Sequence, residues 1–109
     1  MIQLHGNDKD NQDFYHLYEM IDKETGLIFK YGISADPIEK DGMSKRLKEQ
    51  IEYANLIVGW ERFAGWVIKV NIEGNAKARI IEDEYINAFF VEYGKYPIGN
   101  RDRKQKKKK

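Results

Sequence analysis

The sequence contains no cysteine and only two histidines, His5 and His16, among its 109 residues. Without cysteine the chain can form no disulfide and offers no thiolate for metal binding or nucleophilic catalysis. Two histidines are also too few for a zinc site built on several imidazoles. These absences exclude thiol chemistry and a zinc centre of that kind.

Long apolar runs are missing as well. No run approaches the roughly 20 residues that a transmembrane helix needs, and 34% of the residues are charged. The first 13 residues, MIQLHGNDKDNQD, carry three aspartates and lack the apolar segment of a secretory signal peptide. We therefore expect no membrane partner and a cytoplasmic location.

The composition suffices for one compact core, because 41% of the residues are hydrophobic. We divide the chain into a polar lead-in (1–13), one domain (14–101) and a basic tail (102–109). The last nine residues, RDRKQKKKK, hold seven basic residues, whereas residues 1–100 hold 12 basic and 17 acidic ones, a net charge of −5. The tail lacks apolar residues and repels itself, so we expect it to be disordered. It either holds a polyanion without reading sequence or serves solubility alone.

Two segments rich in aromatic and branched residues, 15–21 and 27–34, flank the turn sequence DKETG and predict a β-hairpin. With DKETG as the loop, Tyr18 lies directly opposite Lys30 and shares its face with His16. A third strand is predicted over residues 66–72, where apolar residues alternate.

Helical periodicity precedes and follows the third strand. The first helix begins near Asp41 or Ser44, either of which can cap it, and the second covers residues 76–93 with Asn75 as its cap. The order β-β-α-β-α predicts a small α+β domain with a three-stranded sheet flanked by helices. The stripes expected to be buried are Leu47, Ile51, Ala54 and Val58 on the first helix and Ala78, Ile81, Tyr85, Ile86 and Phe89 on the second. Arg46, Gln50, Tyr53 and Ile57 flank the first stripe.

Glu82 interrupts the apolar pattern around it, since it falls between Ala78 and Ile86 on the second stripe. A carboxylate on a core-facing stripe is costly unless a cation or a hydrogen-bond donor meets it. Glu82 is therefore either half of a structural ion pair with Arg46 or Lys30, or a metal ligand or general base. Its position permits both interpretations.

Arg46 and Tyr18 are open to two interpretations in the same way. An arginine beside a helix stripe usually extends over the edge of the core, but it is also the side chain best suited to grip a phosphate. Tyr18 packs by default, and its phenol carries a proton only if a neighbouring cation lowers its pKa. Lys30, across the ladder, would be that cation.

Together these residues resemble the GIY-YIG nuclease superfamily, and KYGIS is similar to the URI-like nuclease domains of bacterial polymorphic toxins. HLY (16–18) is similar to the GIY element and KYG (30–32) to YIG. Arg46 in SKRL matches the helix arginine, and A-x-x-x-E-x-x-Y-I around Glu82 matches the metal-binding helix. Asn100 matches the final asparagine.

This resemblance implies a metal-dependent endonuclease with one divalent ion, Mg²⁺ or Mn²⁺, held by Glu82. Tyr18 would activate or position the attacking water, and Arg46 would brace the scissile phosphate. Asn100 would close the site by a structural or phosphate hydrogen bond. Lys30 replaces the second motif tyrosine and would stabilise a phosphate.

The resemblance also places His16, Gly32, Ser34 and Gln50 beside the substrate. His16 stands where the family has glycine and could assist proton transfer, and Gln50 stands where many members have histidine. The implied partners are a nucleic acid, DNA rather than RNA, and an immunity protein. As a toxin, the domain would act in the cytoplasm of a target bacterium.

Two other functions fit the same residues. A catalytically inactive module of this fold would bind nucleic acid through residues 101–109, in a salt-sensitive way and without cleavage. A protein-interaction domain would hold Glu82 and Arg46 as a buried pair, so Glu82→Ala would lower its stability by a few kcal/mol.

Overall fold

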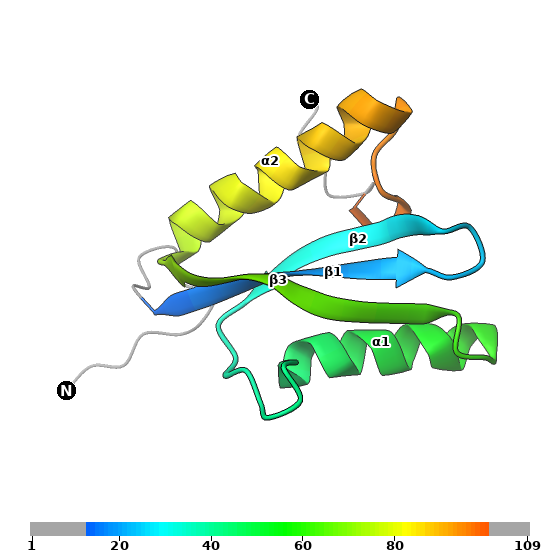
Figure 1. Ribbon diagram of the computed structural model, residues 1–109, viewed down its shortest axis with the longest axis horizontal. Helices are drawn as coiled ribbons and strands as arrows, with labels where there is room; N and C mark the ends of the chain where they lie inside the picture. The colour runs from blue at the N-terminus through cyan, green and yellow to red at the C-terminus, as the bar shows by residue number, and fades with distance from the viewer. Residues whose placement is uncertain (1–12, 101–109) are drawn as a thin grey trace.

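The computed structural model describes residues 13–100, so the predictions for residues 1–12 and for the basic tail lie outside the described residues. A three-stranded antiparallel sheet has the strand order β2-β1-β3 (Figure 1). The predicted α+β class and β-β-α-β-α order are confirmed, with one 3₁₀ turn added. No helix among residues 13–100 is long and apolar enough to cross a membrane. The elements are β1 (Phe14–Asp22), β2 (Leu27–Ser34), α1 (Lys45–Val58), β3 (Phe63–Glu73), α2 (Asn75–Tyr93) and η1 (Ile98–Asn100).

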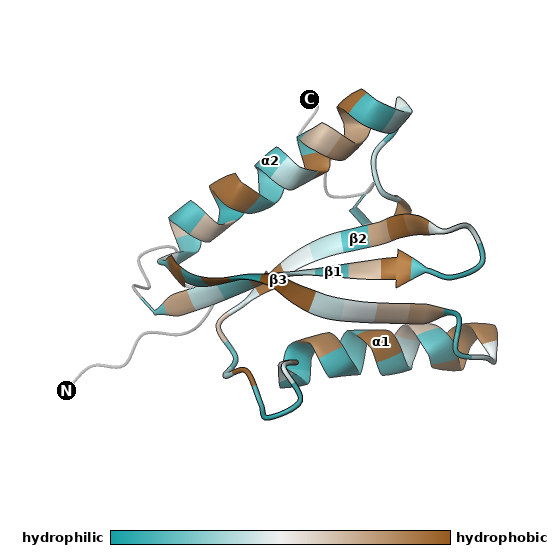
Figure 2. Ribbon diagram, in the orientation of Figure 1, coloured by the Kyte–Doolittle hydropathy of each residue, from teal (hydrophilic) through white to brown (hydrophobic). Residues whose placement is uncertain are grey.

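The two helices cover opposite faces of the sheet (Figure 1). Successive residues of β1 point to opposite faces, so Leu17 packs in the cluster under α2 and Tyr18 in the cluster under α1. Both predicted stripes face the sheet, and Figure 2 shows apolar and polar segments alternating along each helix. The buried clusters are Tyr15, Leu17, Tyr31, Ile72, Ala78, Ile86 and Phe89 on the α2 side, and Tyr18, Met20, Leu47 and Phe63 on the α1 side.

The hairpin register differs from the predicted one. Tyr18 pairs with Gly32, and Lys30 pairs with Met20, because a bulge follows Met20 and β1 continues to Asp22. The pairing of Tyr18 with Lys30 was therefore wrong by two residues. A shift of two residues keeps both side chains on one face but moves Lys30 along the strand, away from the phenol.

Strands β1 and β3 are longer than predicted, and an ion pair between Asp22 and Arg62 joins their ends. Arg62 donates from Nε and Nη2 to the two carboxylate oxygens of Asp22, each at 2.8 Å. The backbone N–H of Lys23 donates to the carbonyl of Arg62 at 2.8 Å. These bonds tie the hairpin end to β3, so β3 begins at Phe63, before the predicted start at residue 66.

One of the predicted helix caps is confirmed and one is wrong. The side chain of Ser44 accepts a hydrogen bond from the backbone N–H of Leu47, so Ser44 is the N-cap of α1. For α2 the prediction was wrong: Gly74 is the N-cap, with a φ of 90° and no side-chain capping bond. Asn75 is instead buried, and its Nδ2 donates to the hydroxyl of Tyr15 at 3.2 Å.

Candidate functional site

A cavity of about 510 Å³ lies along residues 30–34 of β2, and the first turn of α1 and the first half of α2 also line it. Its walls come from elements that are far apart in the sequence and cover both faces of the sheet. Seven of the nine predicted site residues line it: Tyr18, Lys30, Gly32, Ser34, Arg46, Glu82 and Asn100.

Tyr18 reaches this cavity from the central strand because its partner Gly32 has no side chain. A Cβ atom at Gly32 would overlap Cζ and Oη of Tyr18 and would lie 2.7 Å from its Cε1. The ring therefore lies over Gly32, with only 1% of the residue exposed. The glycine of KYG is a steric requirement of the phenol's position.

Burial is the largest effect on the phenol of Tyr18 and raises its pKa. The guanidinium of Arg46 acts in the opposite direction, and the carboxylates of Glu82 and Asp36 raise the pKa further. Arg46, rather than the predicted Lys30, is thus the cation that acts on this phenol. The net shift is upward, so the hydroxyl keeps its proton at neutral pH.

Glu82 occupies the predicted position in the middle of the buried stripe of α2, and only 4% of the residue is exposed. The same helix brings Arg79 and Asn75 to the cavity, one and two turns earlier. Arg79 Nε donates to Oδ1 of Asn75 at 3.0 Å. Arg79 is not among the predicted site residues, although its spacing of three residues from Glu82 is the signal that would have identified it.

Asp36 is a second carboxylate in the cavity wall. It is not among the predicted site residues, because residues 35–43 have the pattern of a loop and no motif that singles out this aspartate. Its Oδ2 accepts a hydrogen bond from the backbone N–H of Arg46 at 3.1 Å. The backbone N–H of Asp36 in turn donates to Oγ of Ser34 at 3.0 Å. Asp36 therefore joins the end of β2 to the first turn of α1 and sets the position of Arg46.

Basic side chains outnumber acidic ones in the cavity wall. Lys30, Arg46 and Arg79 face two carboxylates, those of Asp36 and Glu82. Because residues 1–100 together carry −5, this excess of positive charge is local. A concave wall with an excess of positive charge favours an anion such as a phosphate.

Asn100 forms a clamp on the backbone of Tyr31. Its Oδ1 accepts from the N–H of Tyr31 at 2.9 Å, and its Nδ2 donates to the carbonyl of Tyr31 at 3.0 Å. Of the two hydrogen-bonding roles predicted for Asn100, the structural one is observed. Burial, with a smaller contribution from Glu19, raises the pKa of the Tyr31 phenol to about 12.

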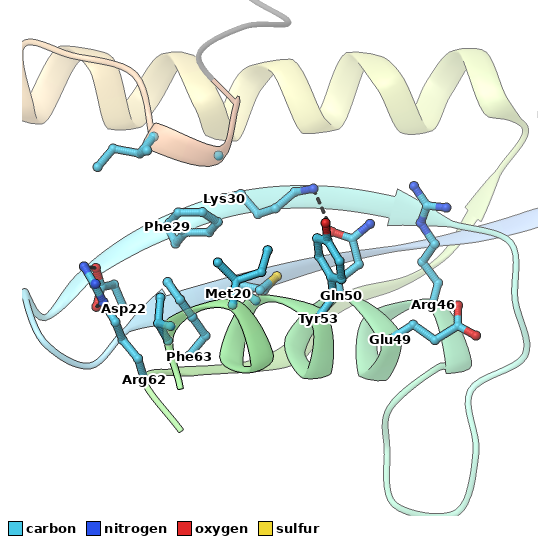
Figure 3. A pocket seen from close by; sticks show the side chains of 15 residues that line it. Met20, Asp22, Phe29, Lys30, Arg46, Glu49, Gln50, Tyr53, Arg62 and Phe63 are labelled. Atoms are coloured by element: carbon cyan, nitrogen blue, oxygen red, sulfur yellow. Dashed lines mark hydrogen bonds and ion pairs between the residues drawn. The ribbon is translucent and has the colours of Figure 1, made fainter. Parts of the chain in front are cut away.

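His16 and Gln50 do not line the cavity. His16 is buried, and its Nε2 lies 2.9 Å from Oγ of Ser44, the N-cap of α1. Burial lowers its pKa, while Asp36 partly counteracts this effect. Gln50 lines a neighbouring groove, where its Oε1 accepts from Nζ of Lys30 at 2.8 Å (Figure 3). His16 therefore contacts the N-cap of α1, and Gln50 holds the side chain of Lys30, so both contact residues next to the cavity.

Comparison with known proteins adds one finding. No curated protein and no solved structure matches the chain. The family model described as URI fold toxin 2 matches residues 7–94, which include all of the strands and nearly all of the cavity wall. A match over this much of the sequence places the chain: it belongs to the URI fold toxin 2 family.

Proposed function

We propose that this domain is a metal-dependent endonuclease of the GIY-YIG type and the toxin domain of an interbacterial effector. The observation that carries the proposal is the convergence of Tyr18, Arg46 and Glu82 on one cavity. The three side chains come from three separate elements: the carboxylate can hold a metal ion that activates water, the guanidinium can stabilise charge on the phosphate, and the phenol can orient the water. Membership of the URI fold toxin 2 family supports the second part of the proposal, that the domain acts as a toxin.

The donor set fits Mg²⁺ or Mn²⁺. Within residues 13–100, no cluster of three or more histidine, aspartate or glutamate side chains is placed to hold a metal. Mg²⁺ does not require one, because it keeps several waters and uses one or two carboxylates together with substrate phosphates. Glu82 is the carboxylate we assign as its ligand. The bound ion would neutralise charge on the phosphate and lower the pKa of a bound water.

The other side chains bind and orient the substrate. Arg46 holds the scissile phosphate by charge-assisted hydrogen bonds, and Arg79 and Lys30 add positive charge in the same wall. The protonated phenol of Tyr18 orients the attacking water by a hydrogen bond. Asn100 acts through the backbone of β2, whose outer edge it supports.

The decisive experiment is a metal-titrated cleavage assay on supercoiled DNA and on structured RNA. We expect cleavage that requires Mg²⁺ or Mn²⁺ and that Glu82→Ala and Arg46→Ala each reduce about a hundredfold or more, equivalent to a loss of roughly 3 kcal/mol of transition-state stabilisation. Glu84→Ala and Lys45→Ala are matched controls, because both are exposed neighbours outside the cavity wall. Cleavage that survives Glu82→Ala would refute the assignment.

The same variants separate the competing functions. Salt-sensitive binding without any metal-dependent cleavage would identify an inactive nucleic-acid-binding module. A loss of several kcal/mol of stability in Glu82→Ala, again without cleavage, would identify a structural role for the carboxylate. We propose DNA as the preferred substrate, the cytoplasm of a target bacterium as the place of action, and an immunity protein as a second partner.

A further inference from the structure

A second hollow, of about 700 Å³, lies beside the candidate site between α1 on one side and β2 and η1 on the other. Figure 3 shows Gln50 and Tyr53 of α1 facing Phe29 and Lys30 of β2 across it. The groove and the candidate site share Lys30, Arg46 and Gly99. The two hollows therefore adjoin at these residues.

The lining of this groove is mainly apolar and aromatic. Phe29 and Phe63 pack together with ring centroids 4.7 Å apart. Tyr53 and Ile57 stand on the rim with 67% and 65% of their surfaces exposed. Apolar side chains gathered around a concave surface are typical of ligand sites, where they bind the flat, weakly polar parts of a ligand.

Charge is distributed unevenly along the groove. Arg46 and Lys30 stand at the end shared with the candidate site, with Glu49 on the same wall. At the other end, Asp22 and Arg62 neutralise each other in a two-bond ion pair. The groove thus offers positive charge next to the candidate site and a neutral, apolar surface beyond it. A nucleotide has the same division, with a phosphate at one end and a flat base at the other.

We propose that this groove binds an unstacked base of the substrate strand, next to the phosphate held in the candidate site, and that Tyr53 stacks on that base. The inference rests on the proposed nuclease function and narrows its substrate class. A base can enter the groove only if it is unpaired or flipped out of a duplex. Nucleic acid with unpaired nucleotides at the cleavage point is therefore the preferred substrate.

Binding in the absence of metal tests this directly. We would measure, with the full chain in EDTA, the affinity for a short single-stranded DNA and for an abasic oligonucleotide with the same number of phosphates. Tyr53→Ala should weaken binding of the base-bearing strand by about 5- to 150-fold, the range measured for loss of one stacking contact. It should leave binding of the abasic strand unchanged.

Leu56→Ala is the matched control. Leu56 stands on the same helix and is 78% exposed, but it lies outside the groove. We expect this variant to bind both oligonucleotides as the unmodified chain does. The proposal would be overturned if Tyr53→Ala and Leu56→Ala lost the same affinity for the base-bearing strand. It would also be overturned if Tyr53→Ala changed the affinity for both oligonucleotides equally; a protein would then be the more suitable ligand to test.

Failure of this proposal can be distinguished from failure of the nuclease proposal. If the chain cleaves nucleic acid and Tyr53→Ala changes neither base-dependent binding nor the preference for unpaired substrate, only the base subsite is refuted. If base-dependent binding through Tyr53 is present and no metal yields cleavage, only the catalytic proposal is refuted.

Discussion

At the scale of single residues, the position of Tyr18 depends on the missing side chain of Gly32. A methyl group there would overlap the ring atoms of Tyr18, so the phenol can occupy the cavity only above a glycine. Neither a turn nor a positive φ requires glycine at position 32, because Gly32 lies within β2 and pairs with Tyr18. The space for the Tyr18 ring is what requires it.

Gly32→Ala should therefore displace the phenol. We expect cleavage to fall about a hundredfold, because misplacing a group that orients a reactant by about 1 Å can cost that much. Circular dichroism should show the strands and helices retained. A double-mutant cycle with Tyr18→Phe provides the control. If Gly32→Ala causes the same loss in a chain that already lacks the hydroxyl, it does not act through Tyr18.

The position of Arg79 predicts how the affinity for nucleic acid depends on salt concentration. As a cation in the cavity wall it would contact a substrate phosphate, and each such contact steepens the salt dependence of binding. Arg79→Ala should reduce the slope of log K against log[salt] by about one, measured by anisotropy with an inactive variant. Lys77→Ala, on the same helix and outside the wall, should leave the slope unchanged.

At the scale of elements, the joint between β1 and α1 depends on the contact between His16 and Ser44. Ser44 caps α1, and His16 holds that cap from the central strand. Burial lowers the pKa of His16, so the folded protein favours the neutral imidazole. The joint sets where α1 begins, and Arg46 lies in its first turn. For this reason a buried histidine matters for the site without lining it.

The lowered pKa predicts a loss of stability in weak acid. A group whose pKa is lower in the folded state stabilises the fold above its unfolded value, here 6.5, and this contribution is lost as pH falls through the folded value. We expect the midpoint of urea unfolding to decrease from pH 7 to pH 5. His16→Gln should flatten this dependence over the same range. An unchanged slope in that variant would assign the effect to other groups.

Asn100 supports a prediction about the link between η1 and β2. Replacing it by alanine leaves the buried N–H and C=O of Tyr31 without their side-chain partner. We expect Asn100→Ala to lower the free energy of unfolding by about 1–3 kcal/mol, measured by urea denaturation. Ile98→Ala is the control, since Ile98 is exposed in the same turn. Equal losses in the two variants would show that the clamp contributes no more than the apolar contact.

At the scale of the whole molecule, the candidate site is assembled around the outer edge of the sheet. Tyr18 belongs to the α1 face and Glu82 to the α2 face, and both line one cavity at the edge strand β2, where Gly32 leaves room for the Tyr18 ring. The groove adjoins the site at Lys30, Arg46 and Gly99, so the two hollows together extend from α2 past β2 to α1.

Much of this arrangement could be predicted from residue patterns. Alternation and helical spacing identified the three strands, both helices and the buried Glu82, since these periods follow from local backbone geometry. Seven of the nine expected site residues share one cavity. The catalytic roles of these residues stay predictions that the cleavage assay must test.

What the sequence by itself determined is the local structure: the order of elements, the apolar stripes and the charged residue placed within one of them. The tertiary structure alone decided the register of Tyr18 against Gly32, the inward turn of Asn75 and the places of Arg79 and Asp36 in the site. These features depend on partners from distant segments, such as Arg62 with Asp22 and Tyr15 with Asn75. Local periodicity carries no information about such partners, because they come together only when the chain folds.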